Sequence, residues 1–563
     1  MKKILFYLMT LLSSVVFLTC TDDAGSGIKT TDEIIITTKA FDAYLHVEFI
    51  DAKTGEYLKG KEVTVNVTGA DANAVYNNLG TEGSKYTSEI GMLDLVVDPS
   101  KSYSDFILKV SAAGYSDYYY RARMNEAKFT PIRIPMTNLA ELPEGVSKGD
   151  QKPITIPSDG KITEDVSISL NNANAISIPE GTTFKDAAGN VVSGKIESKV
   201  LFYNPEEGAA LDAFPGGLDI EAVRPDGETA NITFTSAGLF DIELSSGDQV
   251  VKTIEGEGIQ LTTKLSSSLI NPRTGNPVKE NEEIEMWSMD PNTGVWQYEK
   301  TAKIKRNASG ELYLQENIDH LSYWNWDWFT NSCTYGSKIK WEGNVSGANV
   351  LVKNQHPMNS YSSSSYVYVD VNNSNYNNLQ FQYVPQNMPT TLTFEGYGVD
   401  KDHLTFEPAV LTILNLCDEK TYTVKVIDKD SYLLDIDFDF VSKSNPGIHV
   451  SPSYLYAYLR PFSETYYSAY PISGGTLKTR IKADTDYEVC IYLGNYYGIG
   501  TLKLQEAGNQ MKITITPEFS YNFNDGSLVN AKTEDIFVDK PSGNVIKVSA
   551  IIPISDEAIN NIQ

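Results

Sequence analysis

The sequence is poor in the residues that build metal centres and disulfide frameworks. Its 563 residues include only four cysteines and five histidines. No histidine stands at ligand spacing from another histidine or from a cysteine, so the pattern predicts no zinc site. Apart from Cys20, the cysteines are Cys333, Cys417 and Cys490, and such an odd number allows at most one internal disulfide. We expect three buried thiols, with a Cys417–Cys490 bridge as the alternative.

Positive charge is also scarce. The chain carries 46 lysines and arginines against 73 aspartates and glutamates, which gives a formal net charge of −27 and a sequence pI near 4.6. A field of this sign repels nucleic acids and anionic lipid head groups. We therefore predict no nucleic-acid partner.

Long apolar runs are absent beyond the amino-terminal segment. No later stretch approaches the roughly 18 apolar residues that indicate a membrane-spanning helix. The one apolar segment, Ile4–Leu18, follows Lys2 and Lys3 and ends just before Cys20. A basic start, a short apolar run and a small residue at the end are typical of a secretory signal. The sequence therefore predicts an exported protein with a signal peptide over residues 1–19.

The end of this segment resembles a bacterial lipobox. Thr19 precedes Cys20, and Phe17 stands where the pattern usually has leucine. The resemblance implies cleavage before Cys20, acylation of that cysteine with palmitate or related chains, and a lipid anchor in the cell outer membrane. Several acyl chains together make such an anchor stable, whereas one chain alone is marginal. No cofactor is implied.

The residues after Cys20 form a polar leash with an acidic pair. Thr21–Gly27 contains Asp22 and Asp23 and otherwise small residues. The leash resembles the export signals of surface lipoproteins in the Bacteroidetes, which implies that the protein faces the cell exterior. The alternative is an ordinary flexible linker. We interpret residues 20–40 as lipid anchor and tether, and expect residues after Ser337 to project farthest from the membrane.

From Ala40 onward, short runs alternate apolar and polar residues and are separated by Gly, Asn, Asp and Pro at intervals of about 8–12 residues. This pattern predicts an all-β chain of tandem β-sandwich domains, Ig-like or transthyretin-like. At about 150 residues per domain the length predicts three to five of them.

The first module is predicted over residues 41–139. It contains the strand Tyr44–Ile50, the turn Asp51–Gly55 and the pair Gly114-Tyr115. This order resembles the carboxypeptidase regulatory-like, transthyretin-type sandwich of bacterial surface proteins. The resemblance implies a spacer or binding unit without peptidase chemistry.

A linker is predicted over residues 140–157, followed by a second module over residues 158–330. The second module opens on Ile178-Pro179-Glu180-Gly181-Thr182 and closes on His320-Leu321-Ser322-Tyr323-Trp324. These two blocks resemble the β-sandwich module of netrin receptors, ankyrins and function-to-find domains, relatives of which occur in cartilage intermediate layer proteins and bacterial lipoproteins.

Two further sandwiches are predicted after the second module. Residues 337–415 are rich in Asn, Ser and Tyr, and their alternation favours a sandwich with a polar outer face over disorder. Residues 420–563 form the carboxy-terminal sandwich, whose opening strand Tyr422–Asp428 resembles a degraded copy of the first module's entry.

The block at His320 is the one candidate for covalent chemistry. In function-to-find domains the peptide bond before the serine of such a motif can cleave itself. By resemblance, Ser322 would attack the carbonyl of Leu321 while His320 takes its proton. On a strand the two side chains project from the same face, which favours contact. The alternative is a buried corner in which His320 and Trp324 are structural.

Tyrosine clusters are the candidates for ligand binding. Tyr496 and Tyr497 stand between glycines in a loop-like setting, whereas Tyr454, Tyr456 and Tyr458 share one face of a predicted strand. A tyrosine offers a flat apolar ring and a hydroxyl, which suits a sugar. The alternative is a structural role, because aromatic residues are common in strands anyway.

No other pattern indicates catalysis or metal binding. Phosphate loops, nucleophile elbows, zinc-protease helices and dinucleotide fingerprints do not occur in a convincing context. Asp435, Asp437 and Asp439 alternate with apolar residues, which favours a solvent-facing row of a strand over a calcium loop. We therefore predict no enzyme, no catalytic residues and no metal.

Together these observations predict a lipid-anchored surface protein that binds or adheres without converting its ligand. The expected partner is a glycan or a cell-surface protein. The alternatives are an accessory subunit of an outer-membrane transporter or filament, and a module that cleaves itself at Leu321–Ser322.

Overall fold

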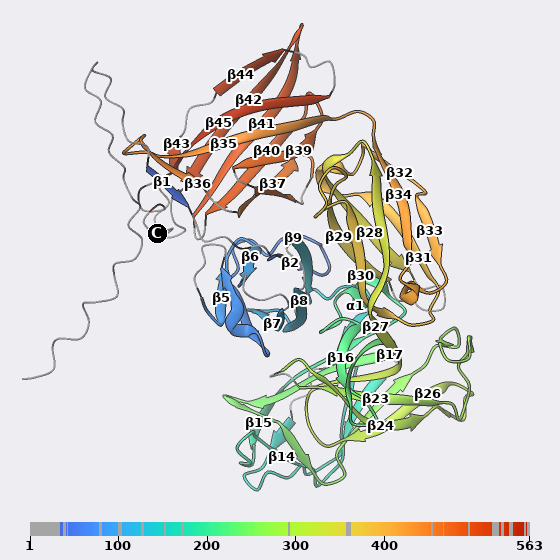
Figure 1. Ribbon diagram of the computed structural model, residues 1–563. Coiled ribbons are helices and arrows are strands. Elements are labelled where there is room, and N and C mark those ends of the chain that lie inside the picture. Colours follow the sequence, from blue (N-terminus) through green and yellow to red (C-terminus); the bar gives the residue numbers. More distant parts are fainter. Residues whose placement is uncertain are drawn as a thin grey trace, which may run out of the picture.

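A computed structural model describes most of the chain beyond residue 33 (Figure 1). The described residues are 34–37, 41, 43–77, 82–98, 104–124, 129–150, 154–170, 174–290, 293–355, 362–451, 454–464, 467–473, 475–493, 496–520, 528–530, 534–539, 544–554, 556 and 559. Cys20 and the segments interpreted as signal peptide and leash lie outside them.

The all-β prediction is confirmed. Strands make up nearly all of the regular structure and are arranged in several separate sheets. Among the described residues the helical elements are short, namely α1 (Gly208–Asp212), η1 (Ala72–Ala74), η2 (Gly398–Asp400) and η3 (Leu416–Asp418). None of the helices in this part of the chain has the length and apolar character needed to span a bilayer.

The first domain is a sandwich of two four-stranded sheets, in the orders β4-β6-β2-β9 and β5-β3-β7-β8. Its strands are β2 (Ala43–Asp51), β3 (Val63–Thr68), β4 (Val75–Asn77), β5 (Lys85–Ser88), β6 (Met92–Val97), β7 (Ser104–Ala112), β8 (Tyr118–Met124) and β9 (Phe129–Met136). In β3 the buried positions alternate, because Val63, Val65 and Val67 face the core.

The second domain combines a large sheet with a five-stranded sheet in the order β12-β13-β20-β26-β25. Its strands before β27 are β10 (Val146–Lys148), β11 (Ile154–Ile156), β12 (Val166–Ser169), β13 (Asn174–Ile178), β14 (Thr183–Lys185), β15 (Gly194–Tyr203), β16 (Asp219–Val223), β17 (Thr229–Ser246), β18 (Gln249–Val250), β19 (Thr253–Glu255), β20 (Ile259–Lys264), β21 (Ile270–Asn271), β22 (Asn276–Pro277), β23 (Glu283–Met289), β24 (Trp296–Lys303), β25 (Lys305–Arg306) and β26 (Leu312–Ile318). β10 and β11, which fall in the stretch interpreted as a linker, both pair with β15.

One strand, β27 (Tyr323–Gly343), continues from the second domain into the third. Its first part pairs with β17 and β23, and its second part pairs with β30 and β34. Residues 331–336, which lie between the second and third predicted modules, are therefore in the middle of a 21-residue strand.

The third domain packs the second part of β27 and its neighbours against a four-stranded sheet, β29-β28-β31-β33, around one apolar core. Its strands are β28 (Ser346–Gln355), β29 (Ser362–Asp370), β30 (Asn378–Pro385), β31 (Thr390–Gly396), β32 (Leu404–Glu407), β33 (Val410–Ile413) and β34 (Thr421–Asp428). β34, expected to open the carboxy-terminal sandwich, pairs here with β27 and β32.

A disulfide joins Cys333 to Cys417 in the third domain. The expectation of three buried thiols is therefore wrong, and so is the alternative bridge between Cys417 and Cys490. The pairing arises because η3 packs against β27, which brings together two residues that are 84 positions apart. Cys490 is buried and takes no part in this disulfide.

The fourth domain is built on a 12-stranded sheet and its apolar core. Its strands are β35 (Tyr432–Ser442), β36 (Ile448–Ser451), β37 (Tyr454–Pro461), β38 (Ser468–Ser473), β39 (Thr476–Ile481), β40 (Asp486–Leu493), β41 (Tyr496–Ala507), β42 (Gln510–Ser520), β43 (Leu528–Asn530), β44 (Glu534–Asp539) and β45 (Val545–Ile554). The same sheet includes β1 (Ile34–Thr37), which pairs in parallel with β36.

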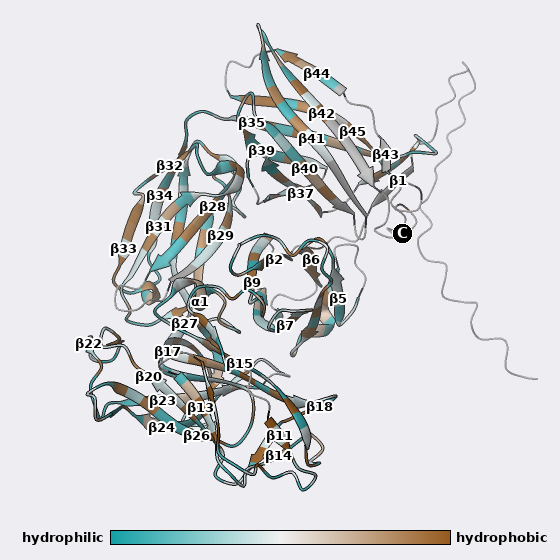
Figure 2. Ribbon diagram, turned by 180° about the vertical axis from the view of Figure 1, so that it is seen from behind, coloured by the Kyte–Doolittle hydropathy of each residue, from teal (hydrophilic) through white to brown (hydrophobic). Residues whose placement is uncertain are grey.

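The first domain lies at the centre of the molecule, with the fourth domain on one side and the second on the other (Figure 1). Because β1 pairs with β36, the chain leaves the expected tether beside the fourth domain. The second domain lies at the opposite end, as both views show (Figures 1 and 2). The expectation that residues after Ser337 project farthest is therefore wrong for the fourth domain.

Candidate functional site

Several buried charged and polar side chains lie where the domains meet. The first of these contacts is made by β2, a strand that is buried on both faces. Leu45, Val47 and Phe49 face the core of the first domain, whereas His46 and Glu48 project from the opposite face. That opposite face is covered by the fourth domain.

A buried triad joins the first domain to the fourth. The imidazole of His46 lies 2.8 Å from Asp94 through Nδ1, and the hydroxyl of Tyr458 in β37 donates to the Asp94 carboxylate at 2.6–2.7 Å. Burial alone would lower the pKa of His46, but hydrogen bonds and charge from Asp94 and Glu48 outweigh it and raise the pKa to about 9. The histidine is therefore a cation between two carboxylates at neutral pH.

Glu48 is the centre of a second set of polar contacts at the interface between the first and fourth domains. Glu48 accepts hydrogen bonds from Arg133 and from the hydroxyl of Tyr57, and Tyr57 in turn accepts one from the backbone N–H of Tyr467 in the fourth domain. Burial would raise the pKa of Glu48, but the charge of Arg133 reverses the direction and lowers it. The Arg133 guanidinium also lies over the ring of Tyr366 in the third domain, at 5.0 Å from its centroid.

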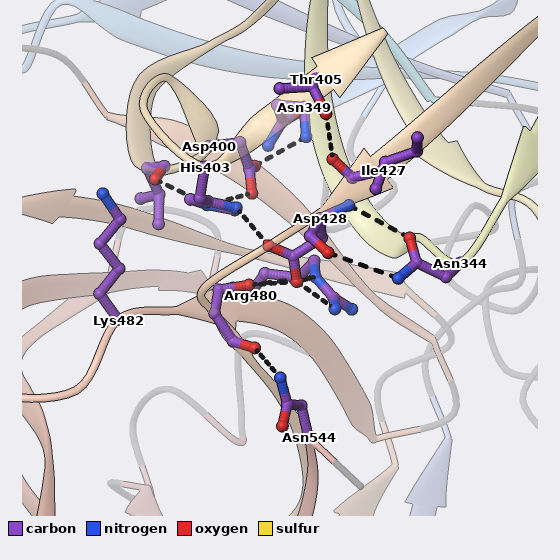
Figure 3. Close-up of polar contacts among 12 residues, drawn as sticks. Asn344, Asn349, Asp400, His403, Thr405, Ile427, Asp428, Arg480, Lys482 and Asn544 are labelled. Carbon is purple, nitrogen blue, oxygen red and sulfur yellow. Dashed lines mark hydrogen bonds and ion pairs between the residues drawn. The ribbon is translucent and has the colours of Figure 1, made fainter. Parts of the chain in front are cut away.

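The third and fourth domains meet at the polar cluster of Figure 3. Asp428, the last residue of β34, bonds to Nδ1 of His403 at 3.0 Å and accepts from Nε of Arg480 in β39 at 2.7 Å. On the other side of the imidazole, Nε2 lies 3.2 Å from Asp400, which accepts a hydrogen bond from the hydroxyl of Tyr470. The side chains of His403, Asp400 and Asp428 are at most 1% exposed.

The charges in this cluster compensate one another. Burial would lower the pKa of His403, but Asp400 and Asp428 raise it to about 9. The pKa of Asp428 is well below its usual range, because hydrogen bonds from His403 and Ser431 and the charge of Arg480 outweigh the effect of burial. Removing one partner of such a buried set costs about 3–5 kcal/mol, since it leaves another charge uncompensated.

The first and second domains are joined by apolar and polar contacts. Ile107 and Tyr119 pack into the same apolar cluster as the core of the second domain. Ser116 donates to Asp241 at 2.7 Å, and Arg121 in β8 forms an ion pair with Glu221 in β16. The interfaces of the first domain with the second and the fourth domains thus contain buried groups from both sides.

The residues of the expected self-cleavage block are engaged elsewhere. Regular strand begins only at Tyr323, so His320 and Ser322 do not share one face of a strand as expected. The imidazole of His320 lies 2.9 Å from Asp319 and packs on Trp324, whereas the hydroxyl of Ser322 donates to the carbonyl of Met289. Leu321 is buried, and its N–H donates to the carbonyl of Lys252 at 3.0 Å. The structure therefore does not pair base and nucleophile.

The tryptophans after this block lie in the core of the second domain. Trp324, Trp326 and Trp328 are each 1% exposed, and each indole N–H donates to an acceptor inside the domain. The face of β27 that carries these tryptophans therefore packs into the core of the second domain.

The expected ligand tyrosines of β37 are covered by the first domain. Tyr456 and Tyr458 are 2% and 1% exposed, and the ring of Tyr456 packs 4.5 Å from that of Phe129. Their rings are thus used for the contact between domains and are not accessible to a sugar. The side chain of Tyr454 lies outside the described residues.

The glycine-flanked tyrosines lie in a strand rather than a loop. Tyr496 and Tyr497 begin β41 and face Leu493 and Tyr492 of β40 in the register of that pair. Both tyrosines are therefore in a regular strand and not in the loop-like setting expected from the flanking glycines. Nothing is described of the two side chains, so their expected role in ligand binding stays a prediction.

One acid in the second domain, Asp327, is completely buried. Asp327 of β27 is 0% exposed, and among the described residues neither of its carboxyl oxygens has a hydrogen-bond partner. Its neighbours across the sheet are Ser236 and Glu285. Burial raises the pKa of Asp327 well above its usual range, because it outweighs the opposing effect of the Ser236 hydroxyl, and the charge of Glu285 adds to the increase.

The alternating aspartates of β35 belong to an ordinary strand face. Asp437 accepts from Thr476, Asp439 bonds to His449 at 2.7 Å, and Asp435 lies 4.0 Å from Lys547. No group of three or more acidic, histidine or cysteine residues able to hold a metal ion occurs within the described ranges.

Sequence reasoning missed the interface residues, although one signal was present. In Tyr44–Ile50 the polar residues His46 and Glu48 alternate with apolar ones. A histidine and a glutamate on one strand face are as compatible with a partner domain as with water.

Comparisons with known proteins give distant likenesses. No protein-family model matches the chain. Human cartilage intermediate layer protein 2 is 24% identical over 141 residues, which are 25% of this chain and 11% of that protein. The chain therefore spans a small part of the length of the curated relative that it matches.

Solved structures with similar parts include bacterial pilins. The shaft pilin SpaA of Lactobacillus rhamnosus GG has a TM-score of 0.16 and 8% identity, covering 39% of this chain and 98% of that one. A streptococcal ancillary pilin has a TM-score of 0.14 and 8% identity over 49% of this chain and 94% of that one. The Bacillus anthracis TIE protein has a TM-score of 0.14 and 9% identity over 73% of this chain and 75% of that one.

Proposed function

We propose that this protein is a non-catalytic binding or adhesion lipoprotein, anchored through Cys20 in the outer membrane and facing the cell exterior. The observation that carries the proposal is the set of buried contacts around the first domain. His46 and Asp94 of the first domain compensate each other, and Tyr458 of the fourth domain donates to Asp94. Asp428, which compensates His403 in the third domain, also pairs with Arg480 of the fourth.

Such contacts favour a fixed arrangement over a string of independent modules. Domains joined by small wet interfaces move relative to one another by default, whereas buried and well-packed interfaces hold them in place. A fixed arrangement transmits a holding force from the membrane to a bound surface. The expected ligand is a glycan or a cell-surface protein, and the anionic charge of −27 disfavours polyanions.

The position of β1 sets which part would face outward. The strand leads directly from the expected tether into the sheet of the fourth domain. With the anchor on that side, the second domain is the part presented farthest from the membrane (Figure 1).

The test uses cells that produce the full chain. Metabolic labelling with a palmitate analogue should mark the wild type, and the matched Cys20→Ser variant should be unlabelled and released into the medium. Protease added to intact cells should cleave the wild type, and these cells should bind to a surface coated with glycans or host-cell proteins. An unlabelled wild type, a Cys20→Ser variant that stays in the outer membrane, or absent binding would contradict the proposal.

Co-purification of a transporter or a filament subunit with the wild type, in place of ligand binding, would favour the accessory role instead. A denaturing gel decides on self-cleavage, because cutting at Leu321–Ser322 would give two fragments and an intact chain gives one band.

A further inference from the structure

The five-stranded sheet of the second domain has an outward face whose middle rows carry hydroxyl and amide side chains and one alanine, with Lys264 and Lys305 at its rim. We name it the amide–hydroxyl face. Two rows cross β12, β13, β20 and β26 from strand to strand, as the pairing register defines. They are Ser167, Ser177, Gln260 and Asn317 in one row, and Ser169, Ala175, Thr262 and Gln315 in the other.

The alternation along each strand separates this face from the core. Ile168, Ile176 and Leu261 point inward and are fully buried, and so is Leu314 of β26. The residues between them point outward and are half-buried or exposed. The face is therefore the solvent side of an antiparallel sheet whose other side is packed.

The two rows contain no charged side chain, which sets this face apart in a chain of charge −27. On the described part of this face an ion pair occurs only at the rim, between Lys264 and Glu311, whereas the outward faces of other sheets carry ion pairs between neighbouring strands. Lys353 pairs with Glu395 in the third domain, and Lys512 pairs with Asp535 in the fourth. Charged residues are the ordinary occupants of a solvent-facing sheet, so an uncharged set on neighbouring strands is unusual.

The amides on this face are held in position by one another. Gln315 donates through Nε2 to Oε1 of Gln260 at 2.8 Å, and Asn317 donates to the carbonyl of Glu257 at 2.8 Å. Each amide carries two N–H donors and a carbonyl acceptor, so capacity for further hydrogen bonds remains after these contacts. Ordering the side chains beforehand reduces the entropy lost on binding.

The edge of the face adds an aromatic ring. Tyr313 stands on β26 one row beyond Gln315 and is half-buried, with Lys264 opposite. A tyrosine provides a flat apolar surface beside the polar rows. Strands are about 4.8 Å apart, so the four strands present a ladder of donors and acceptors roughly 14 Å wide.

We propose that the amide–hydroxyl face binds a neutral polysaccharide. A neutral sugar chain offers hydroxyl groups, which donate and accept, and apolar ring faces, and it brings no charge. Those are the groups that match uncharged amides, hydroxyls and one aromatic ring. The face also lies on β13, β20 and β26 at the end of the molecule opposite β1 (Figures 1 and 2). This inference rests on the proposed binding function and assigns its site and ligand class.

The test is affinity electrophoresis of the purified full chain in gels containing dextran, mannan, xylan or, as a polyanion, alginate. At least one neutral polysaccharide should retard the wild type, and alginate should not. The double variant Gln260→Ala/Gln315→Ala should weaken retardation roughly tenfold, because two amide partners are lost. The matched variant Gln297→Ala, an exposed glutamine on β24 of the same domain, should behave as the wild type.

The outcomes separate this inference from the proposed function. Equal retardation of the double variant and the wild type overturns the site but leaves glycan binding in place. No retardation of the wild type in any neutral gel overturns the inference, while binding of intact cells to host-cell proteins would still support the proposed function. Unchanged thermal unfolding of the double variant shows that any loss of binding is not a loss of folding.

Discussion

A single methyl group at Gly398 tests whether the third and fourth domains are fixed to each other. Gly398 opens η2 with a φ of +58°, and a Cβ added there would lie 1.8 Å from the hydroxyl oxygen of Ser468 in the fourth domain. The same hydroxyl accepts a hydrogen bond from the N–H of Val399 at 3.0 Å. Gly398→Ala therefore strains the backbone and forces the two domains apart.

The expected magnitude is the sum of these effects. An alanine in the left-handed region costs about 1–2 kcal/mol, and overpacking a tight contact costs about 1–3 kcal/mol more. Loss of the hydrogen bond to Ser468 adds about 1 kcal/mol. We expect the contact between the domains to be weakened by roughly 3–6 kcal/mol in total.

The matched control is Gly247→Ala. Gly247 has a φ of +56°, and a Cβ added there meets no atom within 4 Å. Its substitution therefore carries the backbone strain without the clash. In differential scanning calorimetry Gly398→Ala should unfold at a lower temperature than Gly247→Ala, and protease should cut it faster at the connection 429–431. Equal unfolding temperatures and equal cleavage would refute the reasoning, because the clash would then have no effect on docking.

Three further predictions concern buried groups. The pKa of His403 is raised from 6.5 to about 9. Protonated His403 therefore contributes at most about 3 kcal/mol to the free energy of unfolding, and this contribution is fully present below pH 6.5 and is lost as the pH rises through 9. The unfolding temperature of the wild type should fall over this pH range, and that of His403→Gln should fall less. Asp327→Asn should raise the free energy of unfolding at pH 7 by about 1 kcal/mol or more, since burial disfavours a charged carboxylate at this position and the new amide can donate to Glu285. An unfolding temperature lower than that of the wild type would contradict this expectation. Tyr458→Phe should loosen the first domain from the fourth by about 1.5–3 kcal/mol, because it removes a hydrogen bond to a buried charge; unchanged hydrogen exchange of β2 and β37 would argue against it.

The sequence predicted the fold class because alternation within a strand is a local property. The repeating pattern of β3, with Val63, Val65 and Val67 buried, is visible without any knowledge of the tertiary structure. The course of β27 is not visible in this way, because one strand serves two sheets and no break in composition marks the transition.

The interfaces escaped prediction because alternation does not reveal what covers the second face of a strand. Tyr456 and Tyr458 were expected to contact a ligand, and they contact the first domain instead. The bridge between Cys333 and Cys417 depends on how η3 docks on β27, which spacing alone does not fix. The docking of β1 on β36 likewise joins segments more than 400 residues apart.

Buried contacts between neighbouring domains should hold the four domains as one fixed body with the first domain at its centre. Small-angle X-ray scattering of the full-length Cys20→Ser chain should therefore show one compact particle whose scattering matches the arrangement in Figure 1 and does not change with salt concentration. A broad distribution of extended shapes would show instead that the domains move independently.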